Sequence, residues 1–208
     1  MEEIYAKSGN RILKVEERYL CSRVDPITEA RRWVDRVRHH VTGSQGVIIL
    51  GLGAGYHIVD FCRQFPNKKV LVFEQNKGCR QFSERLFPVE LFDLPVLSLT
   101  DFKELEKDCH IQKILSGRFC VLEHKPSMEL KPQWYENLKE TLLGRSLNGL
   151  RLHLQFSRGF SGIQKKRLLW LNKNPVNWRI FDPLVDSQLT SIEDQDFYIV
   201  RTLRELIK

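Results

Sequence analysis

Apolar residues of this chain gather in short, β-branched runs that alternate with segments of helical periodicity. Residues 47–50 (VIIL) and 69–73 (KVLVF) are such runs, and continuous apolar runs are typical of parallel strands buried on both faces. Between them, Ile58, Phe61 and Phe65 recur at the spacing of one helix face. The order strand, helix, strand predicts a βαβ unit.

The same alternation continues through two more strands. Residues 94–99 and 119–122 are the predicted third and fourth strands, and helical segments at 77–86 and 102–115 separate them. Crossover helices place successive strands parallel in one sheet and cover its faces. We therefore predict an α/β, Rossmann-like fold with a doubly wound, mainly parallel sheet.

Antiparallel elements are expected at both ends of the chain. Residues 4–7 and 11–15 flank a Ser-Gly-Asn turn, which predicts an N-terminal β-hairpin. Residues 150–156 (LRLHLQF) alternate strictly between apolar and polar, which predicts a half-buried antiparallel strand. Helical segments should follow at 165–172 and 191–207.

Start and stop signals mark two further helices. Asp25 at the N-cap and Pro26 at the first helical position predict a helix that runs to about His40. Another is predicted beyond Pro132, ending at Gly144. We expect one domain, made of a hairpin appendage, a core and a C-terminal strand with helices, at residues 1–20, 25–145 and 150–208.

Composition agrees with a single globular unit. The chain has 208 residues, of which 42% are hydrophobic and 28% charged, so it can bury a full core and keep a polar surface. No apolar run approaches the roughly 20 residues of a membrane helix, and the acidic start is unlike a signal peptide. We expect a cytoplasmic protein that does not contact membranes. The five cysteines are widely spaced without a C-x-x-C pair, as expected of reduced thiols.

A glycine-rich turn follows the first predicted parallel strand. Residues 51–57 read GLGAGYH, and glycine permits positive φ and lets backbone N–H groups approach a ligand. Glu74 ends the next strand 19 residues after Gly55, close to the roughly 20-residue offset at which an acid binds ribose hydroxyls. These features predict a nucleoside pocket. A tight turn with close helix packing, without any ligand, also accounts for the glycines.

The spacing of the glycines disfavours NAD. The dinucleotide pattern G-x-G-x-x-G would need glycine at Tyr56 or at Ile58. The turn instead resembles the first motif of class I S-adenosylmethionine methyltransferases, in which an acid and any residue precede G-x-G-x-G. Aligned on the second and third glycines of the turn, this chain has Gly51 in place of the acid and His57 in place of the last glycine.

The methyltransferase resemblance implies a set of cofactor-binding residues. S-adenosylmethionine, or another nucleoside-containing ligand, would be bound by residues of the turn and the strand that follows it. Those residues are Gly51, Gly53, Gly55, His57 and Glu74. Asp101, after the third strand, would hydrogen-bond the adenine amino group, although a helix N-cap also explains this residue.

A second resemblance includes residues upstream of the turn. Residues 20–30 (LCSRVDPITEA), 51–57 and 72–76 (VFEQN) resemble the Rossmann-like N-terminal domain of bacterial motility accessory factors. Those proteins are implicated in flagellin glycosylation, and a neighbouring domain in them resembles the archaeal hydroxymethylpterin pyrophosphokinase family. The match covers roughly the first 140 residues and implies a methyltransferase-like Rossmann fold in a bacterial cytoplasmic protein. It implies no catalytic residue, because sugar transfer in that family is assigned to the other domain.

Candidate acid–base residues follow the fourth predicted strand. Glu123 and His124 stand at its carboxyl end, the same edge of the sheet as the glycine turn. Histidine titrates near neutral pH and a nearby carboxylate can orient it, so this pair is the candidate catalytic site. A solvated polar loop is the alternative.

The charge of +7 raises the question of nucleic-acid binding. Basic residues at 31–40 interleave with apolar ones, so we expect them on the solvated outer face of a helix. A second basic cluster at 151–167 contains Phe-Ser-Arg-Gly-Phe-Ser-Gly, which suits base stacking or phosphate contact. The same loop suits a turn with its two phenylalanines anchored in the core.

Several chemistries are excluded by spacing. The six histidines show no metal-ligand pattern, and the chain has no phosphate loop of the form G-x-x-x-x-G-K-[ST] and no G-x-S-x-G elbow. The leading hypothesis is a transferase that uses S-adenosylmethionine and an unknown acceptor. The alternatives are a non-catalytic accessory domain that contacts a protein partner or its own copy, as in a flagellin glycosylation system, and, less favoured, an RNA-binding protein.

Overall fold

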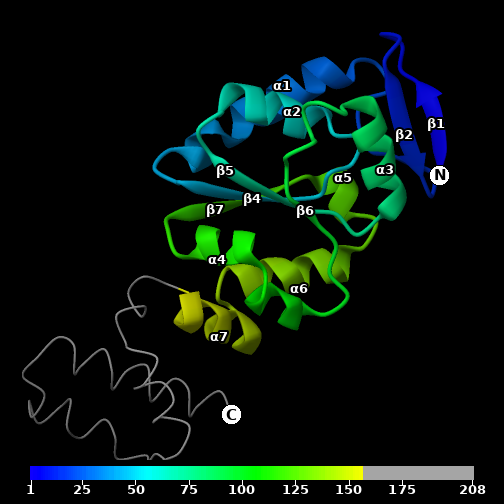
Figure 1. Ribbon diagram of the computed structural model, residues 1–208. Helices are drawn as coiled ribbons and strands as arrows, with labels where there is room; N and C mark the ends of the chain where they lie inside the picture. The colour runs from blue at the N-terminus through cyan, green and yellow to red at the C-terminus, as the bar shows by residue number, and fades with distance from the viewer. Residues whose placement is uncertain (157–208) are drawn as a thin grey trace, which may run out of the picture.

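The central layer is a parallel β-sheet, as drawn in the computed structural model of the protein (Figure 1). The structure describes residues 1–156, and the helical segments predicted at 165–172 and 191–207 lie outside them. Four strands form the sheet: β4 (Gly46–Leu50), β5 (Lys69–Phe73), β6 (Val96–Leu97) and β7 (Phe119–Glu123). Their order is β6-β5-β4-β7, and each neighbouring pair is parallel. The predicted parallel sheet is confirmed, although β6 has only two residues.

Helices cover both faces of the sheet, as Figure 1 shows. On one face lie α1 (Pro26–Val41) and α2 (Tyr56–Gln64), and on the other α4 (Cys109–Leu115), α6 (Pro132–Leu142) and α7 (Leu147–Phe156). Because successive strand residues point to opposite faces, Val47 and Ile49 of β4 pack with α1 and α2, and Ile48 and Leu50 pack with the other layer. All four are fully buried, and each contributes about 1.5–3 kcal/mol of hydrophobic stabilisation.

The start of α1 confirms a prediction made from its capping residues. Asp25 Oδ1 accepts hydrogen bonds from the backbone N–H groups of Ile27 and Thr28, both at 3.0 Å. Its other carboxylate oxygen accepts from the Thr28 hydroxyl at 2.7 Å, and these bonds lower the pKa of Asp25. Pro26 is the first helical residue, where its missing N–H costs nothing.

The N-terminal hairpin is confirmed and extended by one short strand. Strands β1 (Glu2–Tyr5), β2 (Arg11–Val15) and β3 (Arg18–Tyr19) form a separate antiparallel sheet. Ile12 and Leu13 of β2 are fully buried and pack in one cluster with Cys79 and Phe82 of α3 (Lys77–Leu86). The hairpin is therefore part of the core on that side.

The antiparallel strand predicted at residues 150–156 is wrong, because this segment is the helix α7. Gly144 ends the preceding helix with φ +72°. Leu152 is buried and Phe156, one helical turn later, packs in the same cluster beneath the sheet. His153 Nε2 lies 2.7 Å from the Leu142 carbonyl oxygen. Alternating leucines are compatible with a helix face as well as with a strand, and contacts with α6 select the helix.

The helix predicted at residues 102–115 is broken in two. A 3-10 helix (Phe102–Glu106) precedes α4, and Asp108 caps α4 by accepting from the N–H groups of His110 and Ile111 at 2.8 and 3.0 Å. The aspartate thus starts a new helix within the predicted one. Between residues 1 and 156, no helix has the length and apolar character that would let it cross a membrane.

Candidate functional site

The glycine turn joins the carboxyl end of β4 to α2. Gly51, Gly53 and Gly55 have φ values of +100°, +52° and +86°, a region that L-residues rarely adopt. Gly55 is the N-cap of α2, and no side chain caps this helix. The conformational reason for the three glycines is therefore present in the structure, and it holds with or without a ligand.

The Glu74 carboxylate lies beneath this turn and is only 2% exposed. One of its oxygens accepts from the N–H groups of Leu52 and Gly53 at 2.9 and 3.1 Å. The other accepts from the Asn76 N–H at 2.8 Å and the Tyr135 hydroxyl at 3.2 Å. Burial raises the pKa of Glu74, and the four donors act in the opposite direction. The carboxylate joins the turn, β5 and α6.

The groups expected to bind a nucleoside are already hydrogen-bonded to one another within the protein. The N–H groups of Leu52 and Gly53, expected to face a ligand, donate to Glu74 instead. The Ser83 hydroxyl donates to the Gly53 carbonyl at 2.9 Å. A ribose bound to Glu74 would therefore have to replace hydrogen bonds that the protein already makes.

Two histidines cover the other side of the turn. His57 Nε2 donates to the Gly51 carbonyl at 3.1 Å, and its ring stacks on that of His124 with centroids 3.8 Å apart and an interplanar angle of 7°. The edge of Trp33 packs against His57 at 5.0 Å. His124 Nδ1 lies 2.8 Å from the Ser127 hydroxyl. We call His57 and His124 the histidine pair.

Both rings of the histidine pair are buried and uncharged near neutral pH. Burial lowers the pKa of His57 to about 4, and burial together with the adjacent His57 lowers the pKa of His124 well below its ordinary value. A histidine with so low a pKa accepts a proton poorly at pH 7. It still donates and accepts hydrogen bonds, so the pair is suited to holding a ligand rather than to general base catalysis.

The structure does not bring the Glu123 carboxylate to His124. It forms an ion pair with Lys139 of α6 at 2.8 Å, while the Glu123 carbonyl accepts from Trp33 Nε1 at 3.1 Å. Adjacent residues at a strand end point to opposite faces, which separates the two side chains. Ser127, one helical turn after His124, takes the orienting position expected of the carboxylate.

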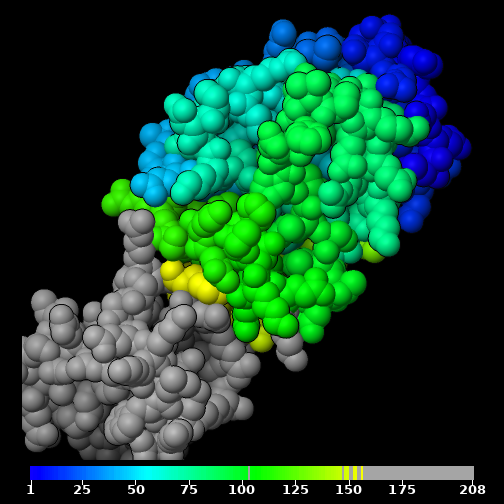
Figure 2. Space-filling model, viewed as in Figure 1, coloured from blue at the N-terminus to red at the C-terminus, as the bar shows by residue number. Residues whose placement is uncertain are grey.

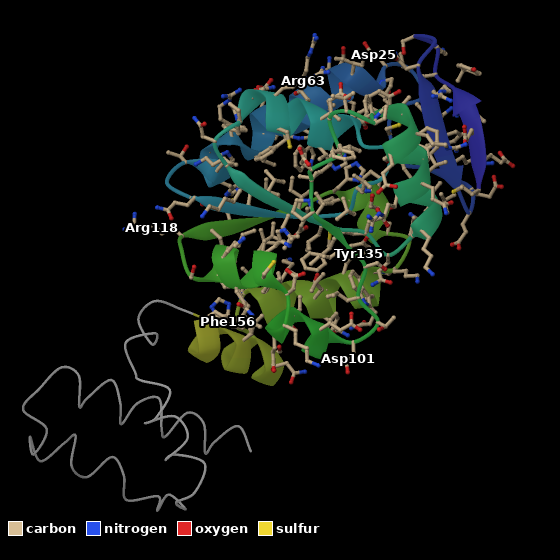
Figure 3. All side chains as sticks on the ribbon, in the orientation of Figure 1. Asp25, Arg63, Asp101, Arg118, Tyr135 and Phe156 are labelled. Atoms are coloured by element: carbon tan, nitrogen blue, oxygen red, sulfur yellow. The ribbon has the colours of Figure 1, made fainter. Side chains whose placement is uncertain are left out.

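Asp101 lies apart from the glycine turn. Its side chain is exposed, and its backbone carbonyl accepts from the Glu104 N–H as the 3-10 helix begins. Figure 3 shows Asp101 at the end of the molecule where α6 and α7 lie. Its predicted contact with an adenine stays a prediction. Asp101 directly precedes the 3-10 helix, and Asp108 is the N-cap of the separate helix α4.

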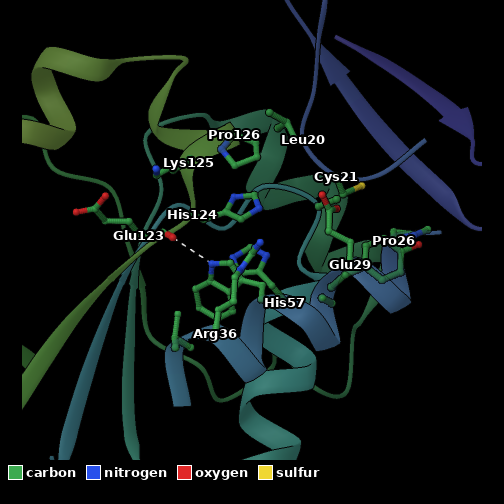
Figure 4. A pocket seen from close by; sticks show the side chains of 15 residues that line it. Leu20, Cys21, Pro26, Glu29, Arg36, His57, Glu123, His124, Lys125 and Pro126 are labelled. Atoms are coloured by element: carbon green, nitrogen blue, oxygen red, sulfur yellow. Dashed lines mark hydrogen bonds between the residues drawn. The ribbon is translucent and has the colours of Figure 1, made fainter. Parts of the chain in front are cut away.

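A pocket of about 370 Å³ lies between α1, the start of α2 and the corner between β7 and α5 (Lys125–Met128). The histidine pair forms part of its wall, as Figure 4 shows. The apolar and aromatic part of the wall consists of Ala30, Trp33, Val37, Ala54 and Tyr56. The charged and thiol-bearing residues of the lining are Cys21, Glu29, Arg36, Glu123 and Lys125. We call it the switch-point pocket, for its position at the junction of β4 and β7.

The switch-point pocket was not predicted from the sequence. Trp33 gave no separate signal, because it has the spacing of an ordinary core residue on α1. Tyr135, which bonds Glu74, lies on a helix 61 residues away. Ser127 carried a usable signal, since it follows His124 by three residues, the spacing of one helical turn.

The remaining sequence features to place are possible metal ligands and the two basic clusters. Over the described part of the chain, no cluster of three or more His, Cys, Asp or Glu side chains could hold a metal ion. Arg31 and Arg32 are exposed on the outer face of α1, as expected. The second basic cluster, proposed for RNA, lies mostly beyond residue 156 and so outside the described residues. Figure 2 shows one face of the described surface.

Comparison with protein-family models, curated proteins and solved structures finds no match for this chain. The fold itself is a mixed α/β arrangement with a four-stranded, all-parallel sheet between helices, consistent with the Rossmann-like class. An antiparallel N-terminal sheet is added to it. Any assignment of function therefore depends on the geometry of the site.

Replacing Gly51 by alanine should destabilise the protein more than the same change at Gly43. A Cβ at Gly51 would lie 2.4 Å from Ser127 Cβ, whereas one at Gly43 meets nothing within 4 Å. Both residues have positive φ, so Gly43→Ala isolates the backbone cost of about 1 kcal/mol, and Gly51→Ala should cost about 3 kcal/mol. Urea unfolding measures both changes. Equal losses would show that Ser127 does not pack against the turn.

Stability should fall in acid because of the histidine pair. Between pH 6.5 and about 4 the unfolded chain binds a proton at His57 that the folded protein does not, so the free energy of unfolding decreases as pH falls. In His57→Gln this decrease should be smaller by about 3 kcal/mol. Urea unfolding at several pH values measures it, with His40→Gln on the exposed face of α1 as the control.

Comparing the variants cancels the contribution of the other titrating groups to the pH dependence of the free energy of unfolding. Glu74, whose pKa is raised, contributes with the opposite sign above its ordinary value, and it is present in every variant. Parallel stability curves for the wild type and His57→Gln would contradict the expected role of the histidine pair.

Proposed function

We propose that this protein binds a small molecule in the switch-point pocket. The observation that carries the proposal is the position of the histidine pair, two buried and stacked imidazoles that line a cavity at the carboxyl edge of a parallel sheet. Polar groups buried in a mainly apolar cavity are the usual feature of a ligand site.

The sheet topology supports this location. After β4 the chain turns to α2 on one face, and after β7 it continues through α5 to α6 on the other face. Where two neighbouring parallel strands send their connections to opposite faces, a crevice forms at their carboxyl ends, and ligands of doubly wound proteins bind there. Residues 54, 56 and 57 after β4 and residues 123–126 after β7 line the pocket.

The size and wall of the pocket fit a small organic ligand. Its volume of about 370 Å³ lies in the range of roughly 300–1,000 Å³ that is usual for such sites. Trp33 and Tyr56 supply flat apolar surface, and the histidine pair supplies hydrogen-bonding groups in fixed positions. Recognition of this kind orients a ligand, and it needs no charged imidazole.

Fragment binding tests the proposal. In a ¹⁵N-labelled sample of the full chain, uncharged aromatic fragments should shift the amide resonances of residues 54–57 and 124. Val37→Trp places a larger side chain at the half-buried wall and should weaken fragment binding at least tenfold. Val89→Trp, at a position that is 83% exposed and away from the pocket, is the matched control and should change nothing.

Either of two results would count against the switch-point pocket. One is a fragment library in which no member shifts these resonances. The other is binding that is equally strong in Val37→Trp and the wild type, with shifts that map to another part of the protein.

The second candidate is a nucleoside-containing cofactor, S-adenosylmethionine, with transfer of its methyl group to an unknown acceptor. The observation in its favour is the glycine turn, in which three residues of positive φ lead into a helix that lacks a side-chain cap. The open N-terminal end of α2 favours negative charge. Binding would require ribose hydroxyls to replace the Leu52 and Gly53 N–H groups at Glu74.

Calorimetry with S-adenosylmethionine and S-adenosylhomocysteine tests this second candidate. Micromolar binding is expected, and Glu74→Gln should weaken it at least tenfold, because an amide has one acceptor oxygen instead of two. Glu84→Gln, at an exposed residue paired with Arg80, is the control. If neither ligand produces heat, the accessory role in contacting a partner protein or a second copy becomes the better explanation of the glycine turn.

A further inference from the structure

Two cations stand at the edge of the switch-point pocket. Arg36 of α1 and Lys125, the first residue of α5, both line it and both have exposed side chains. Among residues 1–156, neither has a side-chain hydrogen bond or an ion pair, whereas Arg38 of the same helix contacts Asp35 and Gln64. We call Arg36 and Lys125 the rim cations. They come from different elements and meet at one cavity.

The wall of the pocket contains an unused hydrogen-bond acceptor. A carbonyl oxygen can only accept, so the contact between His57 and Gly51 places the ring hydrogen on Nε2. In the neutral ring Nδ1 then carries a lone pair, and no donor from the described residues reaches it. His57 is 4% exposed and lines the pocket. A bound molecule that donates a hydrogen bond would satisfy this atom.

Because of Glu29, the two ends of the pocket along α1 carry opposite charges. It lies seven residues before Arg36, with Trp33 between them, which corresponds to about 10 Å along the helix. Figure 4 shows Glu29 and Lys125 on opposite sides of His57. One Glu29 oxygen accepts from the Ser22 N–H at 2.5 Å, and no cation pairs with the carboxylate within residues 1–156. An anionic group is therefore repelled from the Glu29 end and attracted to the rim cations.

We infer that the switch-point pocket takes a small organic acid whose carboxylate or phosphate lies at Arg36 and Lys125 and whose inner end donates a hydrogen bond to His57 Nδ1. The inference rests on the proposed function and names the class of ligand. A hydroxyl or amine is the donor, and a flat apolar body lies between the two ends, against Trp33.

Three related probes separate these features. 4-Hydroxyphenylacetate has both the acid and the donor, phenylacetate lacks the donor, and 4-hydroxyphenylacetamide lacks the charge. Titration of the full chain, followed by the imidazole ¹⁵N resonances of His57 and the amide of Ala54, gives the dissociation constants. The hydroxy acid should bind at least tenfold more tightly than either of the other two probes.

A pair of charge variants tests the rim cations without touching the core. In the double variant Arg36→Gln with Lys125→Gln, the hydroxy acid should bind no better than the amide, and binding of the amide should be unchanged. Arg32→Gln with Lys131→Gln removes two exposed cations that do not line the pocket and is the matched control. All titrations use the same ionic strength, since distant charges are largely screened at about 0.15 M salt.

Each contrary result identifies the part that fails. Equal affinity for the hydroxy acid and its amide would contradict the binding of an anionic group at the rim cations. The same conclusion would follow if the rim variant bound the hydroxy acid as tightly as the control does. Equal affinity for phenylacetate and the hydroxy acid would contradict the hydrogen bond from the ligand to His57 Nδ1. If none of the three probes binds at millimolar concentration, this ligand class is overturned, and the uncharged fragments then decide separately whether the pocket binds small molecules.

Discussion

The buried carboxylate of Glu74 is the interaction on which the arrangement of this site depends. It receives hydrogen bonds from the glycine turn, from the chain after β5 and from Tyr135 on α6, three elements far apart in the sequence. A buried charge is costly unless its oxygens are well bonded, and here four donors satisfy it. The turn is consequently held by hydrogen bonds within the protein, at the edge of the sheet where doubly wound proteins bind nucleotides.

The glycines serve this internal packing as well. Because Gly51 and Gly53 lack a Cβ, Ser127 and His124 can lie directly against the turn, and an added methyl group would come within 3 Å of them. His57 then stacks on His124, and both rings face a cavity on the α1 side of the turn. The Glu74 carboxylate is buried beneath the turn, and the switch-point pocket lies on the other side of it, where the histidine pair forms part of the wall.

Much of the fold was predictable from local patterns. Buried strands, capped helices and the hairpin are encoded within short windows, and Asp25, Pro26 and residues 47–50 show it directly. The segment 150–156 was assigned wrongly because leucines at alternate positions suit a strand or a helix, and its contacts with distant elements decide between them. The side chains of Glu123 and His124 could not be placed in advance, since adjacent residues at a strand end diverge.

The sequence by itself determined the order of strands and helices, the positive-φ turn at the carboxyl end of β4 and the acid at the end of β5. These are local properties, set by apolar periodicity, by glycine and by capping residues. Only the tertiary structure decided that Glu74 bonds the turn, that His57 stacks on His124 and that the cavity lies beside Trp33. Those contacts join residues up to 90 positions apart, and their partners are chosen by packing in three dimensions, which no short window of sequence encodes.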